Sequence, residues 1–196
     1  GIPTLVNEDY DSSNMVYTLF RASHLMTADT DLIIAYGDIV YEPKVLSALM
    51  GCDAPMCVAV DVQWRQYWEL RMADPLSDAE TMKIDDKGMI LELGKKPTGY
   101  HEIQGQYIGL IKIRKDYVVS LRRLYEALDP NEIYDGTSLK KMYMTSLIQH
   151  AINSGWPVQA VPIANGWLEM DTHEDLQVYQ QMQSEGTLSK FCRIEI

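Results

Sequence analysis

Three acidic residues stand where two strands of the predicted sheet end. Asp38 follows the apolar run of residues 32–36, and Gly37 gives its backbone room to turn. Glu169 and Asp171 close a short apolar run that begins at Trp167. Ligands of open α/β sheets bind beyond the carboxyl ends of strands, and gathered carboxylates suit a hard ion such as Mg²⁺. Spacing alone nevertheless favours a simpler role, in which Asp38 forms a turn and Asp171 helps to cap the last helix.

Aromatic residues form a second group with chemical potential. Trp64 and Trp68 lie one turn apart if their segment is helical, and aromatic faces attract quaternary ammonium groups. Asp61, at the end of its strand, is positioned to meet an ammonium group directly. The alternative is a stripe of core residues on one helix face, which we favour because aromatic side chains are mostly buried.

Strand and helix patterns alternate along the chain, which indicates an α/β fold. The predicted architecture is Rossmann-like, with a mixed, mostly parallel sheet and helices on both faces. A hairpin is expected around residues 85–88, and Ser12 or Ser13 is expected to cap the first helix. The predicted strands are 2–6, 31–36, 56–60, 81–84, 89–93, 106–113, 158–163 and 167–170, and the predicted helices are 13–24, 43–50, 116–128, 139–153 and 172–182.

Composition excludes several classes of function. The chain has 196 residues, of which 46% are hydrophobic and 23% charged, as in ordinary globular proteins. A net charge of −11 repels polyphosphate backbones, so nucleic acid is not an expected partner. No apolar run is long enough to span a membrane. The three cysteines, at positions 52, 57 and 192, show no metal or redox spacing; their odd number argues against a disulfide framework and favours a reducing cytoplasm.

Four segments, in order, resemble elements of the sugar-phosphate nucleotidyltransferase superfamily. Residues 31–39 resemble its apolar strand followed by Gly-Asp, and Gly94-Lys95-Lys96-Pro97 resembles its Lys-Pro element. Residues 105–110 resemble the strand beside the acceptor, and residues 167–176 resemble its closing acidic element. Within the superfamily, residues 64–80 and the Gln-Tyr-Ile-Gly strand look most like phosphocholine or aminoethylphosphonate cytidylyltransferases.

The resemblance implies roles for individual residues. Asp38 and Asp171 would bind the catalytic Mg²⁺, with Glu169 as a neighbour that shares the metal or orients its water. Lys96 would meet the phosphate of the acceptor, and Lys95 is an alternative because it is adjacent. Among further substrate-binding candidates, Tyr107 and Gly109 belong to the strand beside the acceptor, whereas Asp61 and Trp64 come from the ammonium argument above.

The implied reaction joins a nucleoside monophosphate, CMP in the closest branch, to a small phosphorylated acceptor such as phosphocholine or aminoethylphosphonate, releasing pyrophosphate. A sugar 1-phosphate acceptor is one alternative, and a non-catalytic regulatory or assembly relative is another. A glycosyltransferase is a third, but its usual pair of acids one residue apart is not found at Asp38-Ile39-Val40. The expected partners are a nucleoside triphosphate and the phosphorylated substrate, and a homo-oligomer stays open.

One element of the superfamily has no counterpart here. Its members begin with a strand and a Gly-rich loop that cradles the triphosphate, whereas this chain starts at Gly1 in what looks like the following strand. We therefore interpret residues 1–196 as a single nucleotidyltransferase domain truncated at its N-terminus. We expect the fragment by itself to be inactive.

Overall fold

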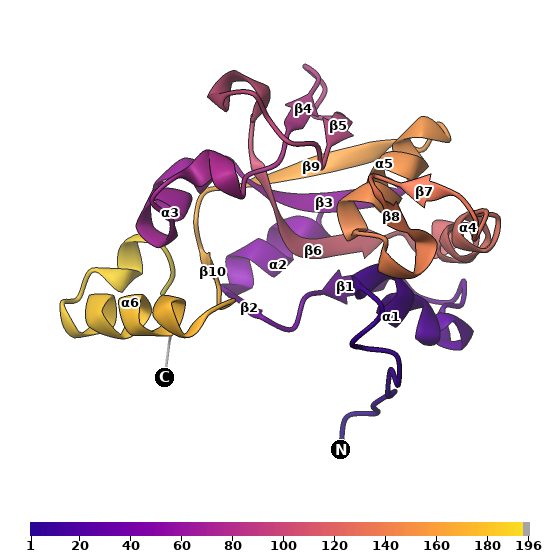
Figure 1. The fold of residues 1–196 in the computed structure, drawn as a ribbon, viewed down its shortest axis with the longest axis horizontal. Coiled ribbons are helices and arrows are strands. Elements are labelled where there is room, and N and C mark those ends of the chain that lie inside the picture. The colour runs from indigo at the N-terminus through magenta and orange to yellow at the C-terminus, as the bar shows by residue number, and fades with distance from the viewer. Residues whose placement is uncertain (194–196) are drawn as a thin grey trace.

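The fold is built around a four-stranded sheet. The computed structural model describes residues 1–193 (Figure 1). β3 is buried along its whole length, as expected for an apolar run without polar alternation. The strand order is β1-β6-β3-β9. The strands are β1 (Leu32–Ala35), β6 (Gln106–Ile113), β3 (Met56–Asp61) and β9 (Val158–Ile163).

The sheet is mixed, as predicted, but contains less parallel pairing than we expected. β3 pairs with β9 in parallel, whereas β6 is antiparallel to both of its neighbours, β1 and β3. The register explains the direction of β6, because Asp61 at the end of β3 faces Gln106 at the start of β6. The chain between these two residues therefore returns to the end of the sheet at which β3 stopped.

Three two-stranded ribbons accompany the sheet. β2 pairs with β10 in antiparallel register. The predicted acidic residues Asp38, Glu169 and Asp171 lie at one end of this ribbon. β4 and β5 form the predicted hairpin, in which Gly88 takes a positive φ of 80°. The ribbon strands are β2 (Ile39–Tyr41), β10 (Trp167–Glu169), β4 (Met82–Ile84), β5 (Ile90–Leu93), β7 (Ile133–Tyr134) and β8 (Thr137–Ser138).

Helices cover both faces of the sheet, which confirms that part of the prediction. Successive residues of a strand point to opposite faces, so β3 supplies Val58 to one core and Ala59 to the other. α1, α4 and α5 pack in the first core, and α2, α3 and α6 pack in the second. The helices are α1 (Met15–Arg21), α2 (Pro43–Met50), α3 (Trp64–Arg71), α4 (Lys115–Glu126), α5 (Met144–Asn153) and α6 (His173–Ser184).

Three local predictions are corrected. Asn14, and neither of the two serines before it, caps α1 by accepting a hydrogen bond from the Met15 amide. The predicted helix 139–153 is split, because a 3₁₀ turn at Leu139–Lys141 precedes α5. Residues 2–6 form no strand, since they pair with no other described strand and their apolar side chains are exposed. The other 3₁₀ turns are Ser23–Leu25, Pro75–Ser77, Tyr100–Glu102 and Leu188–Lys190.

The cysteines differ from the prediction as well. Cys52 and Cys57, on either side of the turn between α2 and β3, are joined in a disulfide. Cys192 is a buried free thiol, and burial raises its pKa to about 11. The odd number of cysteines is therefore compatible with one disulfide and one free thiol. Separately, within residues 1–193 no helix combines the length and apolarity needed to cross a membrane.

The cysteine pairing predicts a definite labelling pattern. Protein unfolded without reductant should take up a single alkyl group, on Cys192, because a disulfide does not react with a thiol-alkylating reagent. After reduction, all three cysteines should be alkylated. Intact-mass spectrometry with peptide mapping distinguishes the two states. Uptake of three groups before reduction would show that Cys52 and Cys57 are free thiols.

Candidate functional site

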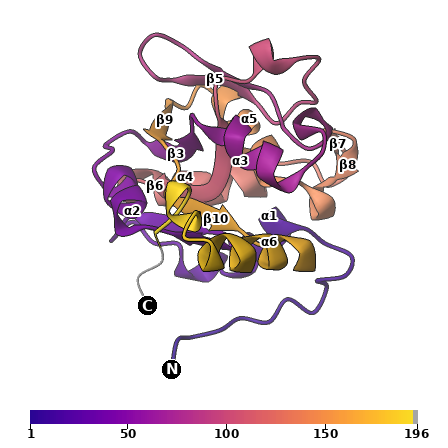
Figure 2. The ribbon, with the colours of Figure 1, turned by 90° about the vertical axis from the view of Figure 1, so that its left-hand side faces the viewer.

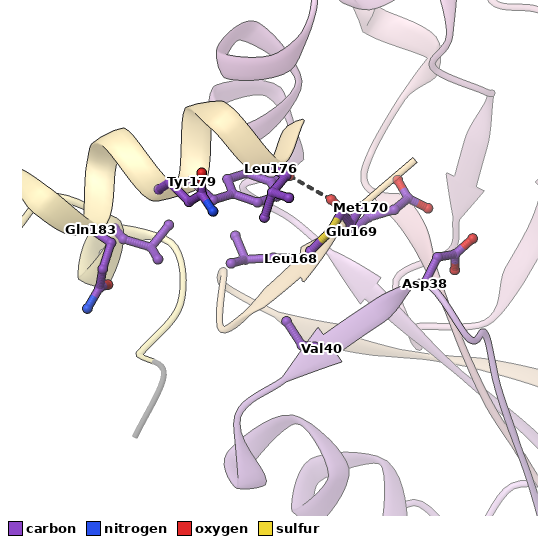
Figure 3. Close-up of a pocket in the computed structure, with 10 residues that line it drawn as sticks. Asp38, Val40, Leu168, Glu169, Met170, Leu176, Tyr179 and Gln183 are labelled. Carbon is purple, nitrogen blue, oxygen red and sulfur yellow. Dashed lines mark hydrogen bonds between the residues drawn. The ribbon is translucent and has the colours of Figure 1, made fainter. Parts of the chain in front are cut away.

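The β2–β10 ribbon brings the predicted acidic residues together. Ile39 faces Glu169 in the ladder, and the Met170 amide donates to the Asp38 carbonyl at 2.9 Å. Asp38 therefore lies just before β2, alongside the residues that follow β10. Figure 3 shows the Asp38 and Glu169 side chains at the same end of the ribbon, both extending away from the apolar residues that line the neighbouring cavity.

Arg71, the last residue of α3, binds three acidic residues at once. Its Nη1 donates to Glu169 Oε2 at 2.7 Å, and its Nη2 donates to Asp171 Oδ2 at 2.6 Å. Its Nε donates to Asp175 Oδ1 at 2.9 Å. The Arg71 side chain is only 2% exposed, whereas that of Asp171 is 45% exposed. A buried cation thus supports carboxylates that reach the surface.

Two tyrosines fix the backbone that carries these acids. The Glu169 amide donates to the Tyr67 hydroxyl at 2.7 Å, and the Tyr179 hydroxyl donates to the Glu169 carbonyl at 2.7 Å. Tyr67 lies on α3 and Tyr179 on α6, and their hydroxyl groups also bond to each other. β10 is therefore held between two helices, which Figure 2 shows on the side of the molecule facing the viewer.

The first turn of α6 supplies the third acid. The Thr172 hydroxyl accepts from the Asp175 amide, and the Asp175 carboxylate accepts from the Thr172 amide, which makes a capping box. The sequence predicted that Thr172 caps this helix, and the structure confirms it. Because the same carboxylate also binds Arg71, the cap connects the start of α6 to the end of α3.

The cluster shifts the pKa values of its members in opposite directions. Burial, together with the negative charges of Asp171 and Asp38, raises the pKa of Glu169 to about 7, although Arg71 opposes this. Burial also favours the neutral form of Asp175, but the hydrogen bonds from Arg71 and Thr172 outweigh it and hold the pKa of Asp175 at about 2. The site therefore keeps one firmly ionised carboxylate beside one that protonates easily.

A cavity of about 260 Å³, which we call the polar cavity, opens beside Glu169 and Asp171. Gly109 lines it in a left-handed conformation, with φ of 79°. A Cβ at this position would lie 2.7 Å from the Tyr36 ring, so only glycine allows the ring to pack there. The other polar and aromatic residues that line the polar cavity are Trp68, Asp78, Glu80, Gln106, Tyr107, Tyr143 and Thr145.

The acidic strand ends have the donor chemistry of a magnesium site of the open kind. Among residues 1–193 no group of three or more His, Cys, Asp or Glu side chains is arranged to enclose one metal ion. Mg²⁺, however, is commonly bound by one or two carboxylates and completed by substrate phosphates and water. The exposed Asp38 and half-exposed Asp171 fit that requirement, although Arg71 already occupies one oxygen of Asp171.

The two predicted lysines lie away from these acids. Lys96 Nζ donates to the backbone carbonyls of Leu76 and Ser77, and Lys95 forms an ion pair with Glu92. Neither lysine lines the polar cavity. The structure thus brings together Asp38, Glu169 and Asp171 but leaves the expected phosphate partner outside, and a role for either lysine stays a prediction.

Asp61 and Trp64 are corrected as substrate-binding candidates. Asp61 is fully buried, and its carboxylate accepts from the Trp167 indole at 2.9 Å and from the Gln63 amide at 2.8 Å. No face of it is left for an ammonium group. Trp64 is 5% exposed and packs in the second core against Trp68, as the favoured alternative predicted. Trp68 belongs to the same core but also lines the polar cavity.

Sequence reasoning missed Arg71, Asp175, Asp78 and Glu80 as site residues. No spacing rule links residue 71 to residues 169–175, because the contact depends on how α3 packs against β10 and α6. The one available signal was the acidic surplus at residues 169–175, which contains four carboxylates and no lysine or arginine. Such a group needs a cation from elsewhere in the chain.

Comparison with known proteins gives one strong relative and many structural neighbours. No protein-family model matches the chain. A CTP:phosphoglutamine cytidylyltransferase from Campylobacter jejuni is 40% identical over 177 residues, which cover 88% of this chain and 70% of the relative. The structure resembles that of the inositol-1-phosphate CTP transferase from T. maritima, with a TM-score of 0.64 and 16% identity over 96% of this chain and 67% of that one.

A second solved structure has the same fold. It is a Bacillus anthracis protein assigned as a glucose-1-phosphate thymidylyltransferase, solved with bound sucrose. The TM-score is 0.61 and the identity 12%, and the match covers 95% of this chain and 65% of that one. At such low identity the two structures show the fold alone. They support the predicted nucleotidyltransferase type of α/β architecture.

The low pKa of Asp175 predicts how the cluster responds to acid. A depressed pKa stabilises the folded state above the ordinary value of 3.8, and this contribution is lost as the pH falls from there to about 2. Asp175→Asn should therefore lower the free energy of unfolding by about 2 kcal/mol at neutral pH. The difference from wild type should shrink below pH 4. Urea titrations of both proteins across this range measure it, and a difference independent of pH would contradict the assignment.

Proposed function

Because the chain belongs to the family of cytidylyltransferases represented by its Campylobacter jejuni relative, we propose that it transfers CMP from CTP to a small phosphorylated acceptor. The observation that carries the proposal is the junction of Asp38 with Glu169 and Asp171 at one end of the β2–β10 ribbon, beside a cavity of substrate size. The cavity is needed for this argument. Without it, Asp38 and Asp171 could be explained equally well as a turn residue and a helix-capping residue.

The reaction exchanges one phosphoanhydride for another. An oxygen of the acceptor phosphate attacks the α-phosphorus of CTP, the bond from that phosphorus to the bridging oxygen breaks, and pyrophosphate leaves with the electron pair. The acceptor oxygen is already ionised, so no general base is needed. Catalysis then depends mainly on holding the two phosphates in line and on neutralising their charge.

We assign the binding of Mg²⁺ to Asp38 and Asp171, with Glu169 as their neighbour. The ion would screen the negative charges of the nucleotide and acceptor phosphates as they approach. Arg71 keeps Glu169, at the end of β10, and Asp171, just after it, in place by direct hydrogen bonds. Glu169, with its pKa near 7, can change its protonation near neutral pH while Asp175 stays ionised.

The acceptor that we propose is small and carries its phosphate or phosphonate on a short chain. The polar cavity has a volume of about 260 Å³, which is small for a nucleotide but suits a compact acceptor. Phosphocholine, aminoethylphosphonate and the phosphoglutamine named for the relative all belong to this size class. Glucose 1-phosphate is the alternative, since sugar 1-phosphates are acceptors elsewhere in the superfamily.

Removing the strand-end carboxylates tests this function. In the full-length protein, Asp38→Asn and Asp171→Asn should each lower the rate of pyrophosphate release from CTP and acceptor by roughly 100-fold or more, because each loses a charged oxygen of the proposed magnesium site. Phosphocholine, aminoethylphosphonate, phosphoglutamine and glucose 1-phosphate serve as the acceptor panel. Chelation with EDTA should stop the reaction, and added Mg²⁺ should restore it.

Asp86→Asn is the matched control, because Asp86 is exposed in the β4–β5 turn, away from the acidic junction. It should leave the rate unchanged. Wild-type release of pyrophosphate in the presence of EDTA would exclude the magnesium role. Full activity of Asp38→Asn would show that the acidic junction is structural.

A further inference from the structure

We propose that Asp61 is a positioning residue of the acidic junction, the place where Asp38 meets Glu169 and Asp171. Asp61 holds the start of β10 against α3, and this fixes where the acids at the other end of β10 lie. The effect on the reaction rests on the proposed function, because the junction influences a rate only if it binds the catalytic ion. The Asp61 side chain does not line the polar cavity, and it bonds to none of the three acids.

The Asp61 carboxylate connects three segments of the chain. Its Oδ1 accepts from the Gln63 amide at 2.8 Å, directly before α3, and from the Asn165 amide at 3.3 Å, in the turn between β9 and β10. Its Oδ2 accepts from the Trp167 indole at 2.9 Å, at the first residue of β10. Both carboxylate oxygens therefore act as acceptors, and together they fix the start of α3 and the start of β10 relative to the end of β3.

The contact with Trp167 is close to the acids. β10 has only three residues, so Glu169 lies about 7 Å along the strand from Trp167. The Trp167 ring packs edge-on against the Tyr67 ring, with ring centroids 5.0 Å apart, and the Tyr67 hydroxyl accepts from the Glu169 amide. Arg71, one turn further along α3, binds the Glu169 carboxylate. α3 and β10 are thus joined at both ends, by Asp61 at one and by Arg71 at the other.

The burial of Asp61 is unfavourable unless the carboxylate has a task. Asp61 is fully buried, and no basic side chain of the described residues lies within ion-pair distance of it. Burial raises the pKa of Asp61, although the hydrogen bonds from Trp167, Gln63 and Asn165 oppose this. A buried carboxylate without a cation destabilises the folded state, whereas an apolar residue in the same core does not. The position that the carboxylate imposes on its three donors accounts for its presence.

The junction depends on this position because Asp38 comes from a separate segment. The Met170 amide, directly after β10, donates to the Asp38 carbonyl at 2.9 Å. A shift of β10 relative to β2 would break this bond and separate the carboxylates on either side of it. Displacing a catalytic group by about 1 Å can lower a rate by about 100-fold.

Asp61→Asn tests the position of the junction directly. The Asn oxygen can keep both amide bonds, but its NH₂ group then faces the Trp167 indole, and two donors cannot bond. In the full-length protein, the amide hydrogens of Glu169 and Met170 should exchange with solvent at least about tenfold faster, whereas those of the β3–β9 ladder should change by less than about twofold. Asp53→Asn makes the same chemical change in an exposed residue before the other end of β3, and it should alter neither set. Residue-resolved hydrogen exchange measures both.

The magnesium dependence of the reaction is the second measurement. Asp61→Asn should raise the Mg²⁺ concentration that gives half-maximal pyrophosphate release by roughly tenfold, while the KM values for CTP and acceptor change by less than about twofold. In a Trp167→Phe background the same substitution should have a several-fold smaller effect, because the opposing indole N–H is absent. If Asp61→Asn does not fold, Trp167→Phe alone, which keeps the carboxylate and both amide bonds, should show the same pattern.

The outcomes separate this proposal from the proposed function. Unchanged exchange at Glu169 and Met170, or equal acceleration there and in the β3–β9 ladder, would overturn the proposal, because Asp61 would then act on the fold as a whole. Faster exchange with an unchanged magnesium dependence would overturn its role in the reaction. A wild-type protein without magnesium-dependent turnover would instead count against the proposed function, and hydrogen exchange would still decide whether Asp61 positions the junction.

Discussion

The Arg71 guanidinium is the interaction on which the acidic site depends. Three carboxylates, from the end of β10, the segment after it and the first turn of α6, converge on it, and without a cation they would repel one another. Because the Arg71 side chain is almost fully buried, its charge is poorly screened and acts strongly on the acids it touches. The chain therefore places the buried guanidinium of Arg71 at the end of α3, and the acidic site surrounds it.

The two cores explain how that helix end reaches its position. α3 packs through its aromatic residues into the second core, which fixes Arg71 relative to β10 and α6. The hydroxyl groups of Tyr67 and Tyr179 meet the backbone of Glu169 at the same place. Core packing and polar contacts thus share residues, so a loss of packing under α3 would displace the carboxylates as well. Trp68 of the same helix lines the polar cavity, and so do Gln106, Tyr107 and Gly109 of β6.

Strand positions could be predicted well because they depend on local apolar runs. β6 and β9 begin and end at the predicted residues. β2, which brings Asp38 to the end of β10, was not among the predicted strands. The antiparallel direction of β6 was harder to predict from the sequence. It depends on the end of the sheet to which the chain returns after the long connection between β3 and β6. Asp61 shows that a position at the end of a strand is not enough to identify a site residue. It stands at a strand end just as Asp38 does, yet the Trp167 indole and neighbouring amides bury it.

Arg71 and Glu80 could not be found in this way, because their roles arise from tertiary contacts. Nothing in the sequence around residue 71 distinguishes it from an ordinary surface arginine at the end of a helix. Glu80 lies in a loop that the Gln106 side chain connects to the start of β6. The family resemblance drew attention to Asp38, Glu169 and Asp171, which belong to local motifs, but not to Arg71 and Glu80, whose contacts are with residues distant in the sequence.

The β2–β10 ribbon also bears on how the protein assembles. It pairs residues 39–41, near the beginning of the chain, with residues 167–169, near its end. Closing so long a loop has an entropic cost that must be met before the pairing stabilises anything. The hairpin of β4 and β5 and the helices need no such closure. The acidic junction therefore depends on a contact between segments that lie far apart in the sequence, and no local element of the chain can form it alone.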